Sequence, residues 1–96
     1  MKLALSAFWR HEMEPRLPAD VEATWFQTVD EAVEAVKGAE VAELDLLCGP
    51  DEFTRILEAG GNLKWVSCCF AGVDRYPTDY IEQRGLLFTN GAGVTA

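Results

Sequence analysis

Two glycine-containing turns in the second half of the sequence have residue types that suit anion binding. The first is "CCFAGVD", in which Ala71 and Gly72 follow a strongly apolar run. A small residue followed by glycine lets a ligand approach the backbone, and consecutive free N–H groups can hold an anion without a charged side chain. Such a turn also arises locally, with Gly72 permitting a tight bend and Asp74 capping it. Spacing alone leaves both interpretations open.

The second turn is "GAGVTA", from Gly91 to Ala96, which follows the apolar run "LLFTN" and spells G-x-G-x-x-A. A dinucleotide-binding fingerprint also needs an opened helix, a following strand and an acidic residue about 20 positions further on. None of these follows Ala96 in the sequence. We therefore interpret Gly91 and Gly93 as a turn that borders a cleft rather than as a cofactor site.

Strand-length apolar runs and helical stretches alternate along the chain and must position these turns. The runs in the second half are apolar on both faces, as in a covered parallel sheet. Helix punctuation separates the runs: a capping box precedes one helix, proline opens another, and glycines end all three. The predicted strands are 3–8, 21–26, 44–48, 63–70 and 86–90, and the predicted helices are 28–38, 50–60 and 77–85.

This alternation predicts an α/β fold with a flavodoxin-like, doubly wound and mainly parallel five-stranded sheet. Residues 1–96 form one domain, and residues 9–20 form a loop with at most one helical turn. No capping signal and no helix follows the last strand, so we expect a truncated amino-terminal segment. In such sheets ligands bind beyond the carboxyl ends of the strands, where both glycine turns fall.

Composition excludes several classes of function. Sixteen acidic residues oppose eight basic ones, for a net charge of -8, and no basic stripe is present that would bind nucleic acid. No apolar run approaches the roughly 18 residues of a membrane helix, and no signal peptide opens the chain. We therefore expect a cytoplasmic protein without nucleic-acid or membrane partners.

The cysteines and the single histidine point to no metal site or thiol chemistry. Cys48, Cys68 and Cys69 are odd in number and lack a C-x-x-C spacing, so we interpret them as reduced apolar fillers. His11 is expected to be an exposed loop residue, too far along the chain to serve as their base. The tryptophans are interpreted as packing residues: Trp9, Trp25 and Trp65.

Residues 62–96, "NLKWVSCCFAGVDRYPTDYIEQRGLLFTNGAGVTA", resemble the amino-terminal portion of the NAD-dependent D-isomer-specific 2-hydroxyacid dehydrogenases. The shared pattern is L-K-W-V, then A-G-V-D, then R-G-L-L-F-T-N and a glycine-containing turn. It covers about a third of the chain. The first sixty residues agree with the family only in the order of strands and helices, which many folds share.

The resemblance implies a substrate domain whose Ala71, Gly72 and Val73 supply backbone N–H groups to the carboxylate of a 2-oxo acid. This leaves the keto carbon facing a nicotinamide for hydride transfer. Asn90 and Thr95, with Thr89, are candidate cleft-lining residues, and Asp74 is structural.

The family's catalytic His, its Glu and its Arg all fall beyond Ala96. The resemblance therefore implies a longer protein with a Rossmann domain for NAD or NADP, which we expect to be a homodimer. The 96-residue chain alone is expected to be inactive and to bind no cofactor.

Two alternatives without catalysis remain. One is a free-standing flavodoxin-like binding or interaction module, although "SAFW" after the first strand suits neither a phosphoacceptor receiver nor a flavodoxin. The other is a scaffold fragment that pairs with other chains through an uncovered apolar sheet face.

Overall fold

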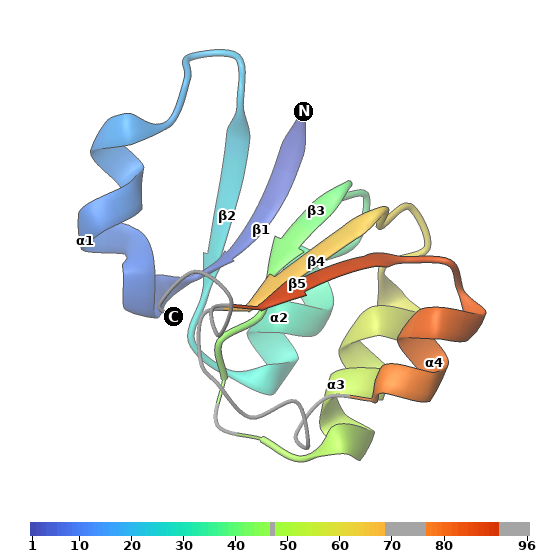
Figure 1. Ribbon diagram of the computed structural model, residues 1–96. Coiled ribbons are helices and arrows are strands. Elements are labelled where there is room, and N and C mark those ends of the chain that lie inside the picture. Colours follow the sequence, from blue (N-terminus) through green and yellow to red (C-terminus); the bar gives the residue numbers. More distant parts are fainter. Residues whose placement is uncertain (47, 69–76, 91–96) are drawn as a thin grey trace.

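The computed structural model describes residues 1–46, 48–68 and 77–90 of the chain. Five strands form one sheet in the order β2–β1–β3–β4–β5, and each neighbouring pair runs parallel (Figure 1). This arrangement confirms the predicted α/β, flavodoxin-like sheet. The strands are β1 (Lys2–Ser6), β2 (Glu22–Phe26), β3 (Val41–Glu43), β4 (Trp65–Cys68) and β5 (Leu87–Asn90).

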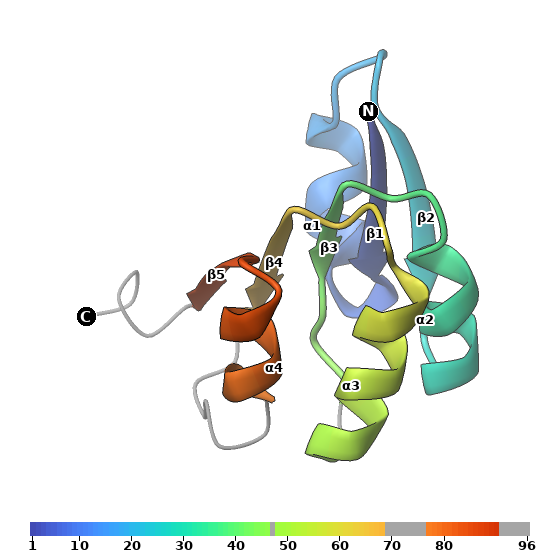
Figure 2. The same cartoon turned by 90° about the vertical axis from the view of Figure 1, so that its right-hand side faces the viewer.

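Helices lie on both sides of the sheet. Figure 2 shows α2 (Val29–Ala35), α3 (Pro50–Ala59) and α4 (Thr78–Gln83) in front of the strands, with α1 (Arg10–Met13) behind them. Two short 3₁₀ turns, η1 (Ala7–Trp9) and η2 (Glu14–Arg16), flank α1. The segment predicted as a loop with at most one helical turn therefore contains one four-residue α-helix between 3₁₀ turns.

The predicted helix signals operate where the sequence places them. The side chain of Thr28 accepts a hydrogen bond from the Glu31 N–H at 3.1 Å, and the Glu31 carboxylate accepts one from the Thr28 N–H at 3.2 Å. Pro50 occupies the first turn of α3. Gly38 and Gly85 follow α2 and α4 with φ of 80° and 69°, a left-handed conformation that favours glycine.

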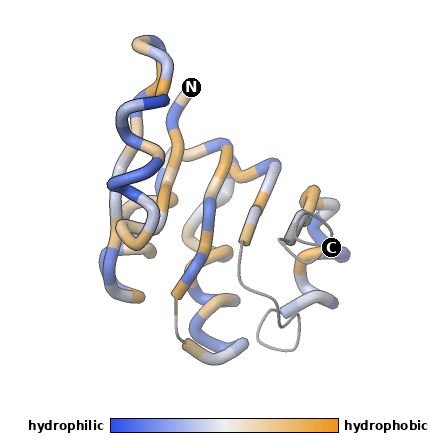
Figure 3. Tube along the Cα trace, turned by 60° about the vertical axis from the view of Figure 1, so that its left-hand side comes forward, coloured by the Kyte–Doolittle hydropathy of each residue, from blue (hydrophilic) through white to orange (hydrophobic). Residues whose placement is uncertain are grey.

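The core lies between the sheet and α2, α3 and α4. Alternate strand residues point toward these helices, and Figure 3 shows hydrophobic residues in the strands and mainly hydrophilic ones along α1. Burial of this apolar surface is the main force that fixes the helices on the sheet. The buried side chains include Ala4, Phe26, Ala42, Leu44, Phe53, Ile56, Leu57, Val66, Cys68 and Ile81.

A row of apolar residues crosses the opposite face of the sheet. Leu3 pairs with Val41, Val41 with Trp65, and Trp65 with Leu87, so the four side chains stand on one face. Trp65 is 40% exposed and Leu87 is 59% exposed. The interpretation of Trp65 as a packing residue is therefore wrong, because no described helix covers β4 and β5 on this side.

The third strand lies earlier than predicted. It spans Val41–Glu43 rather than residues 44–48, and the described residues of that run, 44–46 and 48, form no strand. The apolar side chain of Leu44 is fully buried, so this position is apolar although it lies outside the strand. The Leu44 N–H still donates a hydrogen bond to the Ser67 carbonyl at 2.8 Å. On the other side the pairing with β1 extends to Leu5 and Glu43, and beyond it the Ser6 hydroxyl donates to the Asp45 carbonyl at 2.9 Å.

Candidate functional site

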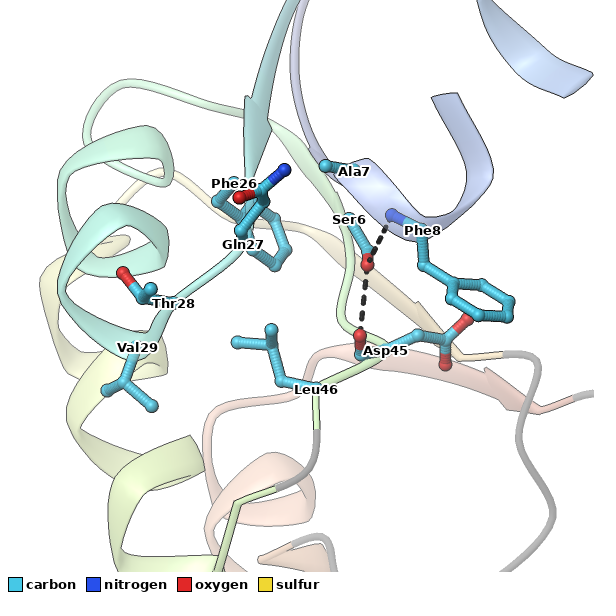
Figure 4. A pocket seen from close by; sticks show the side chains of 9 residues that line it. All are labelled: Ser6, Ala7, Phe8, Phe26, Gln27, Thr28, Val29, Asp45 and Leu46. Atoms are coloured by element: carbon cyan, nitrogen blue, oxygen red, sulfur yellow. Dashed lines mark hydrogen bonds between the residues drawn. The ribbon is translucent and has the colours of Figure 1, made fainter. Parts of the chain in front are cut away.

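The strand order creates a topological switch point between β1 and β3. From β1 the chain passes to β2 on one side and then to β3 on the other. Ligands of open parallel sheets bind in the crevice outside the carboxyl ends of strands at such a point. A cleft of about 450 Å³ lies there (Figure 4). Its walls come from the segments after β1, β2 and β3: Ser6, Ala7, Phe8, Phe26, Gln27, Thr28, Val29, Asp45 and Leu46.

A hydrogen-bond network ties the floor of this cleft together. The buried Ser6 hydroxyl donates to the Asp45 carbonyl at 2.9 Å and accepts from the Phe8 N–H at 3.4 Å. The indole N–H of Trp9 donates to the Asp45 carboxylate, which belongs to a residue only 3% exposed. The end of β1 and the turn after it are therefore fixed to Asp45 by two side-chain donors, one bonded to its carbonyl and one to its carboxylate, although these residues lie more than 35 positions apart in sequence.

The start of α2 borders the same cleft but does not suit an anionic ligand. The Glu31 carboxylate accepts hydrogen bonds from the Gln27 N–H at 2.8 Å and from the Thr28 N–H at 3.2 Å. These two N–H groups, which precede the helix, are thus already paired with a negative charge that would repel an anion. This part of the cleft favours neutral groups.

The loop that the sequence proposes for carboxylate binding follows β4. Ala71, Gly72 and Val73 lie outside the described residues, as does Asp74. The structure does show where the loop begins, because Glu43 pairs with Ser67 and β4 ends at Cys68. The last residue of β4, Cys68, therefore lies at the carboxyl edge of the sheet, one strand away from the strand that precedes Asp45.

Of the predicted cleft-lining residues, Thr89 and Asn90 lie among the described residues and Thr95 does not. Asn90 is the last residue of β5 and pairs with Cys68, so its backbone is at the carboxyl edge beside the end of β4. The Thr89 hydroxyl accepts a hydrogen bond from the Trp65 indole at 2.9 Å on the open sheet face. Thr95, together with Gly91 and Gly93, lies outside the described residues.

Two of the three cysteines and the histidine lie among the described residues. Cys48 and Cys68 are reduced, and Cys69 lies outside the described residues. Burial, with the Glu52 carboxylate as the smaller cause, raises the pKa of the Cys48 thiol from 9.0 to about 11. That thiol is therefore protonated at neutral pH and is a poor nucleophile. His11 is exposed as predicted, but on α1 rather than in a loop.

Sequence reasoning missed the contribution of the first two strands to the site. It assigned no role to Phe8, Gln27 or Asp45, which line the switch-point cleft. The usable signal was the position of these residues directly after apolar runs, since the carboxyl ends of parallel strands share one edge. What was lacking was the strand order, which decides that the ends of β1 and β3 are neighbours.

The described residues hold neither a metal centre nor a membrane span. No group of three or more His, Cys, Asp or Glu side chains in residues 1–46, 48–68 and 77–90 is arranged to hold a metal ion. In the same ranges no helix has the length and apolar character needed to cross a membrane.

Comparison with models of protein families shows which family the chain belongs to. Residues 3–96 match the family model described as D-isomer specific 2-hydroxyacid dehydrogenase, catalytic domain. The chain belongs to this family. The match extends the resemblance from residues 62–96 to nearly the whole sequence of this family member, since it also includes residues 3–61. A search of curated proteins gave no match.

Solved structures have the same fold as this family member. A D-isomer specific 2-hydroxyacid dehydrogenase from Lactobacillus delbrueckii ssp. bulgaricus, in an NAD-complexed form, is 21% identical over 94% of the chain, with a TM-score of 0.64. A protein from Thermus thermophilus is 20% identical over 98% of the chain, with a TM-score of 0.62. The apo form of D-lactate dehydrogenase from Escherichia coli is 18% identical over 94%, with a TM-score of 0.60.

The chain spans only 29–31% of the length of these three proteins. Its described residues do not fit a dinucleotide. The segment after β1 has no glycine-rich turn, and the Gln27 and Thr28 N–H groups before α2 are paired with the Glu31 carboxylate rather than open to a pyrophosphate.

Proposed function

We propose that this chain is the substrate-domain segment of a longer oxidoreductase that interconverts 2-oxo acids and D-2-hydroxy acids with NAD or NADP. Membership of the D-isomer specific 2-hydroxyacid dehydrogenase family, through the match over residues 3–96, is the observation that carries this proposal. The cofactor, which supplies or accepts the hydride, would bind to residues outside this chain, because the described residues do not fit a dinucleotide. The full-length protein would act as a cytoplasmic homodimer.

The proposed role of this segment is to hold the substrate. Backbone N–H groups of Ala71, Gly72 and Val73 would bind the carboxylate of the 2-oxo acid, since a small residue followed by glycine leaves room for a ligand at the main chain. The position of β4 supports this role, because the strand ends at the carboxyl edge between β3 and β5. Fixing the carboxylate there would orient the keto group for reaction.

The first experiment measures NADH oxidation by the full-length gene product with a panel of 2-oxo acids that includes glyoxylate, pyruvate, hydroxypyruvate and phenylpyruvate. Turnover of at least one substrate, with the D-hydroxy acid as product, is the expected result. A well-folded protein that turns over none of them contradicts the proposal. Expression of residues 1–96 alone should give no turnover, because the proposed reaction needs groups that this chain does not contain.

The second experiment tests the carboxylate-binding loop. Gly72→Val places a branched side chain where the substrate would approach the backbone, so KM for every 2-oxo acid should rise at least about 10-fold, while NADH affinity stays unchanged. Gly61→Val is the matched control, because nothing lies within 4 Å of a Cβ at Gly61. Equal KM values for Gly72→Val and Gly61→Val would show that the loop does not bind the substrate.

A binding or interaction module without catalysis is the second candidate. The exposed row that includes Trp65 and Leu87 on the open sheet face favours it, because adjoining exposed apolar residues often mark interaction surfaces. Concentration-dependent self-association of the full-length protein that Trp65→Ser abolishes, without turnover of any 2-oxo acid, would support this function over the enzyme.

A further inference from the structure

One exposed aromatic side chain occupies the edge of the sheet where ligands bind. Among the described residues, four large apolar side chains are exposed: Met1, Phe8, Trp65 and Leu87. Three of them lie at the amino-terminal edge, at or just before the first residue of β1, β4 and β5. Phe8 follows the carboxyl end of β1, lines the switch-point cleft and is 64% exposed.

Phe8 is held in position although its ring is exposed. Its N–H donates to the Ser6 hydroxyl at 3.4 Å, and Ser6 is bonded to the Asp45 carbonyl. The ring packs edge-to-face on Trp9, with ring centroids 4.9 Å apart and an interplanar angle of 84°. Trp9 is fixed in turn by the Asp45 carboxylate. An aromatic side chain ordered before binding contacts a ligand at a small entropic cost.

The cleft beside Phe8 suits an uncharged apolar group. Phe26, Val29 and Leu46 supply apolar wall, and the cleft of about 450 Å³ is large enough for an aromatic or branched side chain. The Glu31 carboxylate already accepts hydrogen bonds from the Gln27 and Thr28 N–H groups before α2, and the buried Asp45 carboxylate lies on the other side. A second carboxylate on a ligand would meet two fixed negative charges here.

The cleft also lies near the carboxyl end of β4, at Cys68. Only β3 separates β1 from β4 in the sheet, and adjacent strands are about 4.8 Å apart, so their carboxyl ends are about 10 Å apart. In Figure 4 the Phe8 ring points away from Gln27 and Thr28, toward the side where Asp45 lies. A small aromatic acid is long enough to span this separation.

We propose that Phe8 forms a wall of the subsite for the side chain of the 2-oxo acid. It selects substrates with a bulky apolar side chain over those with a second carboxylate. This assignment rests on the proposed function, because it takes the loop after β4 as the place where the substrate carboxylate binds. Phe8 contacts the part of the substrate that does not react, so it sets specificity and leaves the chemical step unchanged.

The test uses steady-state kinetics of the full-length protein with NADH and three substrates: phenylpyruvate, glyoxylate and 2-oxoglutarate. Wild type should prefer phenylpyruvate to 2-oxoglutarate. Phe8→Ala should lower kcat/KM for phenylpyruvate about 10-fold and leave glyoxylate within about 2-fold, because glyoxylate has no side chain to contact the ring. Phe8→Leu, which keeps an apolar side chain, should recover part of the loss. Leu87→Ala removes a similarly exposed apolar side chain at the opposite edge and should leave the substrate ratio unchanged.

Other results overturn the assignment. A wild-type protein that reduces glyoxylate or 2-oxoglutarate but not phenylpyruvate contradicts it while the proposed function stands. The same is true if Phe8→Ala lowers kcat/KM equally for phenylpyruvate and glyoxylate, or changes neither. If Phe8→Ala does not fold, the ratio of kcat/KM for phenylpyruvate to kcat/KM for glyoxylate is measured for Phe8→Leu instead. A ratio equal to that of the wild type contradicts the assignment. Absence of turnover with every 2-oxo acid refutes the proposed function itself, and with it this assignment.

Discussion

Adding one methyl group at Gly60 should destabilise the protein, whereas the same change at the next residue should not. A Cβ built at Gly60 would lie 2.5 Å from Cδ1 and 2.8 Å from Cγ of Leu63, and 3.2 Å from Cβ of Val36. Leu63 is 5% exposed and Val36 is fully buried, so neither side chain has solvent to move into. At Gly61 nothing lies within 4 Å of such a Cβ.

The magnitude follows from the cost of overpacking. Forcing an extra methyl group into a well-packed core typically costs about 1–3 kcal/mol. For a domain of this size, each 1 kcal/mol lowers Tm by roughly 4–8 °C, so Gly60→Ala should lower Tm by at least about 4 °C. Gly61→Ala should be neutral or slightly stabilising, because alanine restricts the unfolded chain without a clash in the folded one.

Urea unfolding followed by tryptophan fluorescence, with circular dichroism as a second probe, measures both variants under the same conditions. A double variant with Leu63→Ala identifies the cause. Truncating Leu63 should cost about 2–5 kcal/mol in the wild type and distinctly less in the Gly60→Ala background, because the truncation also removes the clash. Equal stability of Gly60→Ala and Gly61→Ala would refute the packing argument, and additive effects in the double variant would refute the role of Leu63.

Two further predictions concern single side chains. Because the pKa of Cys48 is raised from 9.0 to about 11, its alkylation by iodoacetamide at pH 8 should be about 100-fold slower than in the urea-unfolded chain, and Glu52→Gln should speed it, as measured by peptide mass spectrometry. The folded protein holds this proton more tightly, so the Cys48 contribution to stability is complete below pH 9 and is lost as the pH rises toward 11. Equal rates of Cys48 alkylation in the folded and the urea-unfolded chain would contradict the raised pKa. The Arg84 guanidinium donates to the carbonyls of Leu57 at 2.5 Å and of Gly60 at 3.0 Å, which ties the end of α3 to α4, so Arg84→Met should cost roughly 1–2 kcal/mol in urea unfolding, and Arg84→Lys less. If Arg84→Met unfolds at the same urea concentration as the wild type, these hydrogen bonds add no net stability.

Local sequence determined α2, α3 and α4 and the approximate places of β1, β2, β4 and β5. The signals at Thr28, Pro50 and Gly85 work through residues within one helical turn or through the allowed conformations of a single residue, so no knowledge of the fold was needed to interpret them. The alternation of these elements with apolar runs indicated the α/β class for the same reason. The motifs of residues 62–96 identified the family, which the match over residues 3–96 confirmed.

Tertiary structure decided what those elements form together. The run at 44–48 was interpreted as a strand because it is apolar, but its burial comes from contacts with distant elements, and the strand itself is Val41–Glu43. Trp65 was expected to pack, yet its exposure depends on which helices cover which face. The cleft beside Phe8 exists because β1 and β3 are adjacent and Ser6 meets Asp45, 39 positions away. Such long-range pairings arise from the burial of whole faces, which no window of neighbouring residues contains.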